Sequence, residues 1–164
     1  MFRLSVVLWF LLGAVVSAQS DSDPAMKALA DRFDASNRLA AMKAVSCTFG
    51  EGTIRTLSAV EEPEPEATSM ASPIIFSNID IKGRKAVMGG NQGGANVLVL
   101  LGKGGLTFVE ITEAGNIVTT TIFPSRPRVG TKALLAVHSR HISAFPLGTN
   151  AIVSQYYGQC IPVE

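Results

Sequence analysis

The chain has 164 residues, with 14 Lys and Arg against 13 Asp and Glu, and a formal net charge of +1. This near-neutral balance, without a basic stripe, argues against binding to nucleic acid or to an anionic membrane surface. The length suits one domain with a single hydrophobic core once a short N-terminal segment is set aside.

That N-terminal segment, residues 1–18, has the features of a secretory signal peptide. Arg3 provides a positive start, residues 4–16 form an apolar run, and Val16-Ser17-Ala18 resembles a cleavage site. The run is shorter than the ~20 residues that cross a bilayer comfortably. We therefore expect an exported, periplasmic or secreted chain that begins near Gln19 and is not stably inserted in a membrane. An uncleaved N-terminal anchor is the alternative interpretation.

Residues 19–44 are predicted to form a helical arm. Ser22 or Asp23 can cap a helix whose first position is Pro24, where the missing N–H costs nothing. Apolar side chains then recur at helical spacing, namely Met26, Leu29 and Phe33. We expect a helix over about 24–44, amphipathic in its first half. An arm that is only loosely packed on the rest of the chain is the alternative.

Residues 45–164 are predicted to form an antiparallel β domain. Short β-branched or aromatic runs alternate there with Gly, Pro, Asn and Asp clusters. The predicted strands cover 45–49, 53–59, 74–79, 84–88, 96–101, 106–112, 117–123, 134–139 and 151–157. The acidic run 61–66 is predicted to be a solvated loop. Many short strands with little helix between them predict a mainly β fold, either a sandwich or a small closed barrel.

Two glycine-rich segments, 89–94 and 102–105, lie between predicted strands. Neither ends in the Gly-Lys-Ser/Thr pattern of a phosphate-binding loop, and no helix pattern follows either of them. Neither segment therefore directs the N–H groups of a helix N-terminus at an anion, and we expect no anion site there. We therefore interpret both segments as hairpin turns.

Two cysteines remain after removal of the signal peptide, Cys47 and Cys160. Export would place them in an oxidising compartment, where an even pair usually joins. The bridge would close a span of 113 residues (160 minus 47) and stabilise the fold by roughly 4–5 kcal/mol on a chain-entropy model. Two buried free thiols are the alternative.

The first and last predicted strands carry their cysteines on apolar faces. Val45 and Phe49 share a face with Cys47 because side chains alternate along a strand. Apolar side chains share a face with Cys160 in the same way, namely Ile152 and Tyr156. We therefore predict that the two strands are neighbours, with these side chains buried together around a disulfide bond.

The densest polar cluster is His138-Ser139-Arg140-His141. On a strand, His138 and His141 point to opposite faces, so shared binding of a metal ion is not expected. Ser139 and His141 face the same way, yet no nucleophile-elbow glycines surround Ser139. One hypothesis is therefore structural, with Arg140 tying its strand to the following loop, 143–150.

The second hypothesis for this cluster is a binding mouth. In it, His138, Arg140 and His141 would line the mouth together with Gln155 or Tyr157 from a neighbouring strand. Arg140 would then present a fixed positive fork to a carboxylate or another anion.

One acidic residue, Glu110, lies in an otherwise apolar predicted strand. A buried carboxylate without a partner carries a heavy desolvation penalty. We therefore expect Arg84, Lys85 or solvent beside it.

Several short strings resemble a group of small exported proteins of alphaproteobacteria that carries no assigned activity. The strings are Cys47-Thr48-Phe49, Asn78-Ile79-Asp80, Leu106-Thr107-Phe108-Val109-Glu110, Ser139-Arg140-His141 and Ser154-Gln155-Tyr156-Tyr157-Gly158-Gln159-Cys160. The resemblance covers about 47–160. It implies a periplasmic address and a compact domain, and it assigns no functional residue.

No catalytic, metal-binding or cofactor-binding motif stands out from these patterns, so we predict no catalytic residue, no metal and no cofactor. We expect an exported, non-enzymatic domain that binds a small or apolar ligand or an envelope partner protein. A hydrolase that uses His138, Ser139 and His141 is one alternative, and a purely structural envelope component is another. Converging Ser, His and acid side chains would indicate the enzyme, and a cavity with few polar groups would indicate the ligand carrier.

Overall fold

The computed structural model describes residues 23–58, 63–90, 93–125, 131–143 and 151–163. These residues form one helix and nine strands. The elements are α1 (Pro24–Ala41), β1 (Val45–Leu57), β2 (Glu66–Ser69), β3 (Ile74–Asp80), β4 (Lys85–Gly90), β5 (Gly93–Gly102), β6 (Gly105–Ile111), β7 (Ile117–Ile122), β8 (Leu134–Ser143) and β9 (Ala151–Pro162). The predicted signal peptide, residues 1–18, lies outside the described residues.

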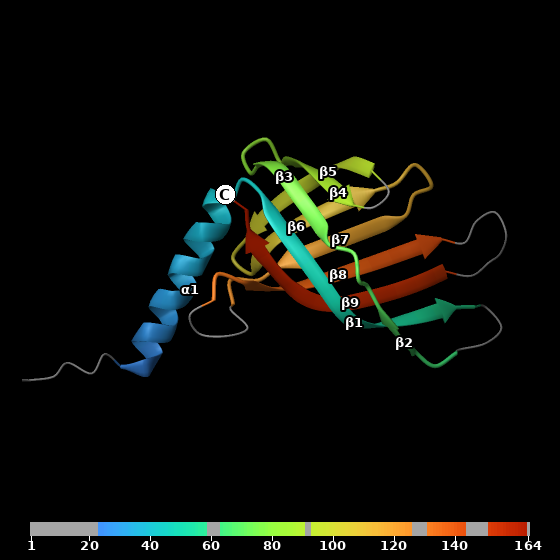
Figure 1. Cartoon of the computed structure of the whole chain (residues 1–164), viewed down its shortest axis with the longest axis horizontal. Coiled ribbons are helices and arrows are strands. Elements are labelled where there is room, and N and C mark those ends of the chain that lie inside the picture. The colour runs from blue at the N-terminus through green and yellow to red at the C-terminus, as the bar shows by residue number, and fades with distance from the viewer. Residues whose placement is uncertain (1–22, 59–62, 91–92, 126–130, 144–150, 164) are drawn as a thin grey trace, which may run out of the picture.

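The strands form one antiparallel sheet that closes on itself as a barrel (Figure 1). Strands β3 to β9 pair in chain order, β3 pairs with β1, and β9 returns to pair with β1 along its length. Eight strands thus form the closed wall, while β2 pairs with β1 outside it. Closure removes the free edges at which sheets of different molecules pair. Of the two predicted architectures, the protein adopts the barrel.

Helix α1 begins as the sequence predicts. The Asp23 carboxylate accepts a hydrogen bond from the Ala25 backbone N–H (2.9 Å), and Pro24 occupies the start of the helix. The helix ends at Ala41, three residues before the predicted boundary, because the backbone of Met42 is extended.

The two halves of α1 are packed differently. Leu39, near the C-terminal end, is 1% exposed and belongs to the barrel core, whereas Leu29 is 63% exposed. Figure 1 shows α1 at one end of the barrel, with its first turns projecting away from it. The alternative prediction of a loosely packed arm therefore holds for the first half of the helix only. No helix within the described ranges has the length and apolar composition of a membrane span.

The inward side of the wall carries the core. The rings of Phe76 and Phe108 stack with centroids 3.9 Å apart, and both side chains are fully buried. The other large, fully buried apolar side chains are Leu39, Ile79, Leu106, Ile122, Leu134, Val45 and Val99. Along most of the strands, buried residues alternate with partly buried or exposed ones, which is the pattern expected of a wall with one dry face.

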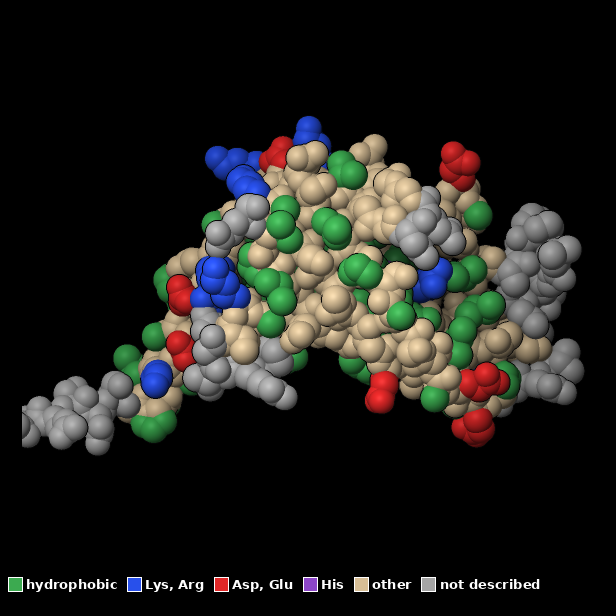
Figure 2. Space-filling model, viewed as in Figure 1, with side chains coloured by type: hydrophobic (Ala, Val, Ile, Leu, Met, Phe, Trp, Pro, Cys, Tyr) green, Lys and Arg blue, Asp and Glu red, His purple; other side chains and the backbone are tan. Residues whose placement is uncertain are grey.

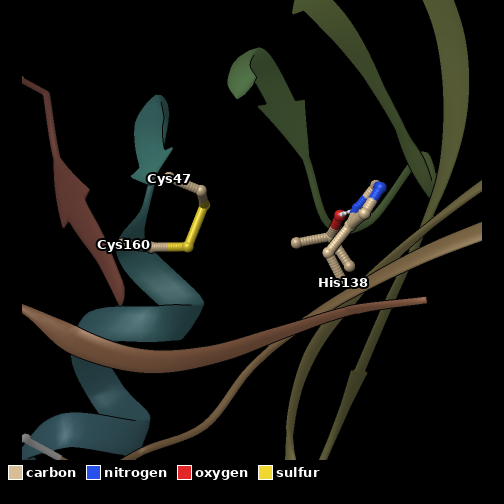
Figure 3. The surroundings of a disulfide bond; sticks show 4 residues. Cys47, His138 and Cys160 are labelled. Carbon is tan, nitrogen blue, oxygen red and sulfur yellow. Dashed lines mark hydrogen bonds between the residues drawn. A yellow bond between two sulfur atoms is a disulfide. The ribbon is translucent and has the colours of Figure 1, made fainter. Parts of the chain in front are cut away.

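The pair of strands that closes the barrel carries the disulfide bond. Cys47 and Cys160 lie directly opposite each other on β1 and β9, with their Cα atoms 4.0 Å apart, and are joined (Figure 3). The predicted pairing of the first and last strands is confirmed. Three of the four side chains predicted around the bridge, Val45, Phe49 and Tyr156, are buried. The fourth, Ile152, is only partly buried near the start of β9.

Strand β1 is longer than predicted. The prediction placed two strands, 45–49 and 53–59, on either side of Gly50 and Gly52, whereas the protein forms one strand that ends at Leu57. The register between β1 and β9 shifts at Gly52, and a Cβ atom there would overlap the carbonyl oxygen of Gln155. Gly52 therefore permits close approach of two strands and does not mark a turn.

Strand β2 is a second correction. It begins at Glu66, the last residue of the run 61–66 that was predicted to be a loop, and no strand was predicted over 66–69. Most of its side chains are exposed, so the segment has no buried face that an apolar pattern would reveal. The glycine-rich segments agree better with prediction, since β4 and β5 meet at Gly90 and Gly93 and β5 turns into β6 after Gly102.

Candidate functional site

A cavity of about 600 Å³ opens into the barrel from the end away from α1. Glu110 and Arg140 line it near the C-terminal ends of β6 and β8, whereas α1 lies beside the end at which β8 begins. The segment 69–74, between β2 and β3, and the glycines at the β4–β5 connection form its rim. On the face shown in Figure 2, the surface is hollowed and a basic side chain lies at the hollow.

Strand pairing places two opposite charges at one level of the wall. Glu110 on β6 pairs with Val118 on β7, and Val118 pairs with Arg140 on β8. Neighbouring strands are about 4.8 Å apart, so the Glu110 and Arg140 backbones are separated by roughly 10 Å across the wall. Both side chains are partly buried and line the same cavity.

His138 lies one level deeper on β8 and is 3% exposed. Its Nδ1 atom is 2.9 Å from the hydroxyl oxygen of Thr120, which lies opposite it on β7. The rings of Phe49 and Tyr156 flank the imidazole, with centroids 5.3 Å and 6.1 Å from it. Figure 3 shows His138 well apart from the disulfide bond.

The surroundings of His138 keep it neutral. Burial, and to a lesser degree the Arg140 charge, lowers the pKa of His138 from 6.5 to about 4. A neutral imidazole can donate one hydrogen bond and accept another. Because Nδ1 is engaged with Thr120 and no described residue bonds Nε2, that nitrogen can bind a molecule in the cavity.

No described residue pairs with the charges of Glu110 and Arg140. Within the described ranges, neither side chain forms a hydrogen bond or an ion pair. Arg84 and Lys85, the cations predicted beside Glu110, are exposed and do not line the cavity. Among the described residues that line the cavity, Arg140 is the Lys or Arg that accompanies Glu110.

The structure brings together two of the five predicted binding residues. His138 and Arg140 alternate with Ser139 and therefore share the inward face of β8. The other three predicted binding residues, His141, Gln155 and Tyr157, are exposed on the outside of the barrel, where the Tyr157 hydroxyl donates to Gln155 Oε1 at 3.1 Å.

The outward face also holds two of the three residues of the alternative hydrolase, Ser139 and His141. Ser139 and His141 face away from the cavity, since both alternate with its lining residues. The hypothesis that Arg140 ties its strand to the loop 143–150 concerns residues of which 144–150 lie outside the described part of the chain.

Sequence reasoning missed several contributors to the site. Thr120, which holds His138, lies in the predicted strand 117–123 and was not singled out. Its alternation with the apolar residues Val118 and Ile122 was the signal that it faces inward. The segment 69–74 carries no such signal. It lines the cavity because it passes across the mouth of the barrel, and the closure of the barrel is not predictable from the sequence alone.

A second depression, of about 1100 Å³, lies between α1 and the barrel. Its lining is mainly apolar, with Met26, Leu29 and Phe33 from the helix and Leu101 and Leu135 from the wall. These helix side chains are the stripe predicted at helical spacing. They line an open groove and do not enter the core.

No group of three or more His, Cys, Asp or Glu side chains within the described part of the chain is arranged to hold a metal ion. No family model, curated protein or solved structure matches this chain.

Proposed function

We propose that this protein is an exported binding protein for a small molecule, and that the barrel cavity is its site. One observation carries the proposal: Arg140 is partly buried inside a cavity of about 600 Å³ and forms no bond among the described residues. Sites for small molecules have volumes of roughly 300–1,000 Å³ and contain a few polar groups that orient the ligand.

The lining suggests how the ligand is held. The Arg140 guanidinium presents donors in a planar fork, which suits a carboxylate or another anionic group. His138 offers one ring nitrogen beside it, and Met88 and Val118 provide apolar wall for the body of the ligand. We therefore propose a ligand with an anionic group and a compact apolar part.

The groove beside α1 is a weaker candidate for the ligand. It is open and mainly apolar, so little in it would fix the orientation of a small molecule. Catalysis is not proposed, because Ser139 and His141 face away from the cavity and from His138.

The proposal of export rests on the N-terminal pattern and on the disulfide bond between Cys47 and Cys160. Disulfide bonds persist in oxidising compartments and are rare in the cytosol. We propose a periplasmic or secreted protein whose mature chain begins near Gln19, in keeping with the resemblance to small exported proteins of alphaproteobacteria. Intact mass of the exported protein tests this, and a full-length product in the membrane fraction would contradict it.

Native mass spectrometry of the exported protein tests the binding site. We expect a bound small molecule on the wild type, its loss in Arg140→Ala, and its retention in the control Lys85→Ala, which removes a positive charge from the outer wall. Retention of the same molecule by Arg140→Ala would contradict the proposal, and so would a wild type that carries no molecule and binds none that is added.

A further inference from the structure

The cavity holds two charges of opposite sign, and their placement indicates the class of ligand. Resting on the function proposed above, we infer that the ligand is a zwitterion, whose anionic group pairs with Arg140 and whose cationic group pairs with Glu110. Such a molecule carries a carboxylate or similar anion and an amine on one short, compact body.

The argument begins with the number of ionisable groups. Of the described residues that line the cavity, three are ionisable, namely Glu110, His138 and Arg140. His138 is held by Thr120 and stays neutral, so it contributes a hydrogen bond and no charge. The charges that a ligand meets are therefore one carboxylate and one guanidinium.

The second step is that these two charges are separated. Val118 lies between Glu110 and Arg140 in the register of the wall, and no ion pair within 4.0 Å joins them across the described residues. A partly buried charge without a partner is costly because it has lost part of its hydration. A molecule with one charge would pair with one side chain and leave the other unpaired.

The third step is complementarity. A zwitterion places an anion at the guanidinium and a cation at the carboxylate, so both protein charges gain partners on binding. The rest of the described lining consists of small or apolar residues, with glycines at the rim and Met88 and Ala95 within, and none of these residues is charged. A direct pair between Glu110 and Arg140, formed by rotation of both side chains, is the competing arrangement.

Calorimetric titration with matched probes separates these arrangements. The zwitterions are glycine, 4-aminobutyrate and 6-aminohexanoate, and the anions without the amine are acetate, butyrate and hexanoate. We expect at least one zwitterion to bind roughly tenfold or more tightly than its matched anion, since a charge-assisted hydrogen bond is gained at Glu110. Equal affinity within every matched pair, or no binding of any zwitterion, would overturn the inference.

Two substitutions test whether Glu110 causes the preference for the zwitterion over its matched anion. Glu110→Gln keeps the size of the side chain and is expected to remove the advantage of the zwitterion while leaving the binding of its matched anion. Glu113→Gln, in an exposed turn, is the control and should preserve the advantage. A preference that survives in Glu110→Gln would overturn the inference, and melting curves establish that both variants are folded.

The accurate mass of the molecule bound to the exported wild-type protein is an independent readout. It tests the inference even if the Glu110→Gln variant fails to fold. An elemental composition with nitrogen and a carboxylate or another acidic group supports the zwitterion. A bound acid that lacks a basic nitrogen would overturn this inference and leave the proposed binding function standing. A wild-type protein that carries no molecule and binds none of the six probes would overturn both.

Discussion

The hydroxyl oxygen of Thr120 lies 2.9 Å from Nδ1 of His138, and this hydrogen bond joins β7 to β8 on the inside of the barrel. It fixes the plane of an imidazole that is otherwise surrounded by the rings of Phe49 and Tyr156. The buried position keeps the ring neutral, and the engaged Nδ1 leaves Nε2 for the cavity. His138 therefore links the packing of the core to the chemistry of the proposed site.

The first prediction concerns acid stability. The pKa of His138 is lowered from 6.5 to about 4, by burial first and by Arg140 second, so the unfolded chain binds more protons than the folded chain between these values. The stabilisation is present above pH 6.5 and is lost as the pH falls towards 4, by about 3 kcal/mol for this residue. Urea unfolding at pH 7.5 and pH 4 measures the loss.

Two variants isolate this contribution from other acid-sensitive groups. His138→Gln should lose about 3 kcal/mol less than the wild type between the two pH values. His141→Gln, at an exposed position on the same strand, should behave as the wild type does. Equal losses in the wild type and His138→Gln would contradict the assignment.

The second prediction concerns the disulfide bond between Cys47 and Cys160. Replacing both residues with Ala should lower the free energy of unfolding by about 4–5 kcal/mol, because the bridge closes a span of 113 residues at the strands that complete the barrel. Denaturant unfolding with and without reductant measures the effect. Reductant should destabilise the wild type and leave the double variant unchanged, and an equally stable double variant would refute the prediction.

The third prediction compares two leucines of α1. Leu39→Ala should cost about 2–5 kcal/mol, because its side chain is 1% exposed in the barrel core. Leu29→Ala should change stability by less than about 0.5 kcal/mol, because that side chain lines the open groove. Similar losses in the two variants, measured by denaturant unfolding, would show that the first half of α1 is packed more tightly than described.

These elements also show how far the sequence predicts the fold. Alternation along the strands predicts which side chains face inward, and it pairs the two cysteines correctly. It does not distinguish a sandwich from a barrel, because both have walls with one dry face. Gly52 was misinterpreted as the end of a strand, since a glycine that admits a neighbouring backbone has the same appearance in sequence as a glycine in a turn.

The site was predictable in part from the same alternation of side chains along the strands. Residues two apart on a strand share a face, so His138 and Arg140 could be placed together. Gln155 and Tyr157 were placed wrongly beside them, although the inward assignment of Tyr156 already put both on the other face. Glu110 lines the same cavity as Arg140 only because of two successive strand registers, which local sequence patterns do not determine.

The fourth prediction distinguishes a structural from a binding role for Arg140. Arg140→Ala should change the free energy of unfolding of the ligand-free protein by less than about 0.5 kcal/mol, because its guanidinium forms no bond within the described part of the protein. A tie to buried carbonyl groups would instead be worth roughly 1–3 kcal/mol. Chemical unfolding of ligand-free wild type and variant provides the measurement, and a loss in that higher range would favour the tie.

A crystal structure of the exported protein, purified without added small molecules, tests the central claim most directly. We predict electron density for a small molecule inside the barrel, with an anionic group within hydrogen-bond distance, roughly 2.7–3.2 Å, of the Arg140 guanidinium. A cavity that contains only water, with Arg140 and Glu110 paired directly to each other, would contradict the claim.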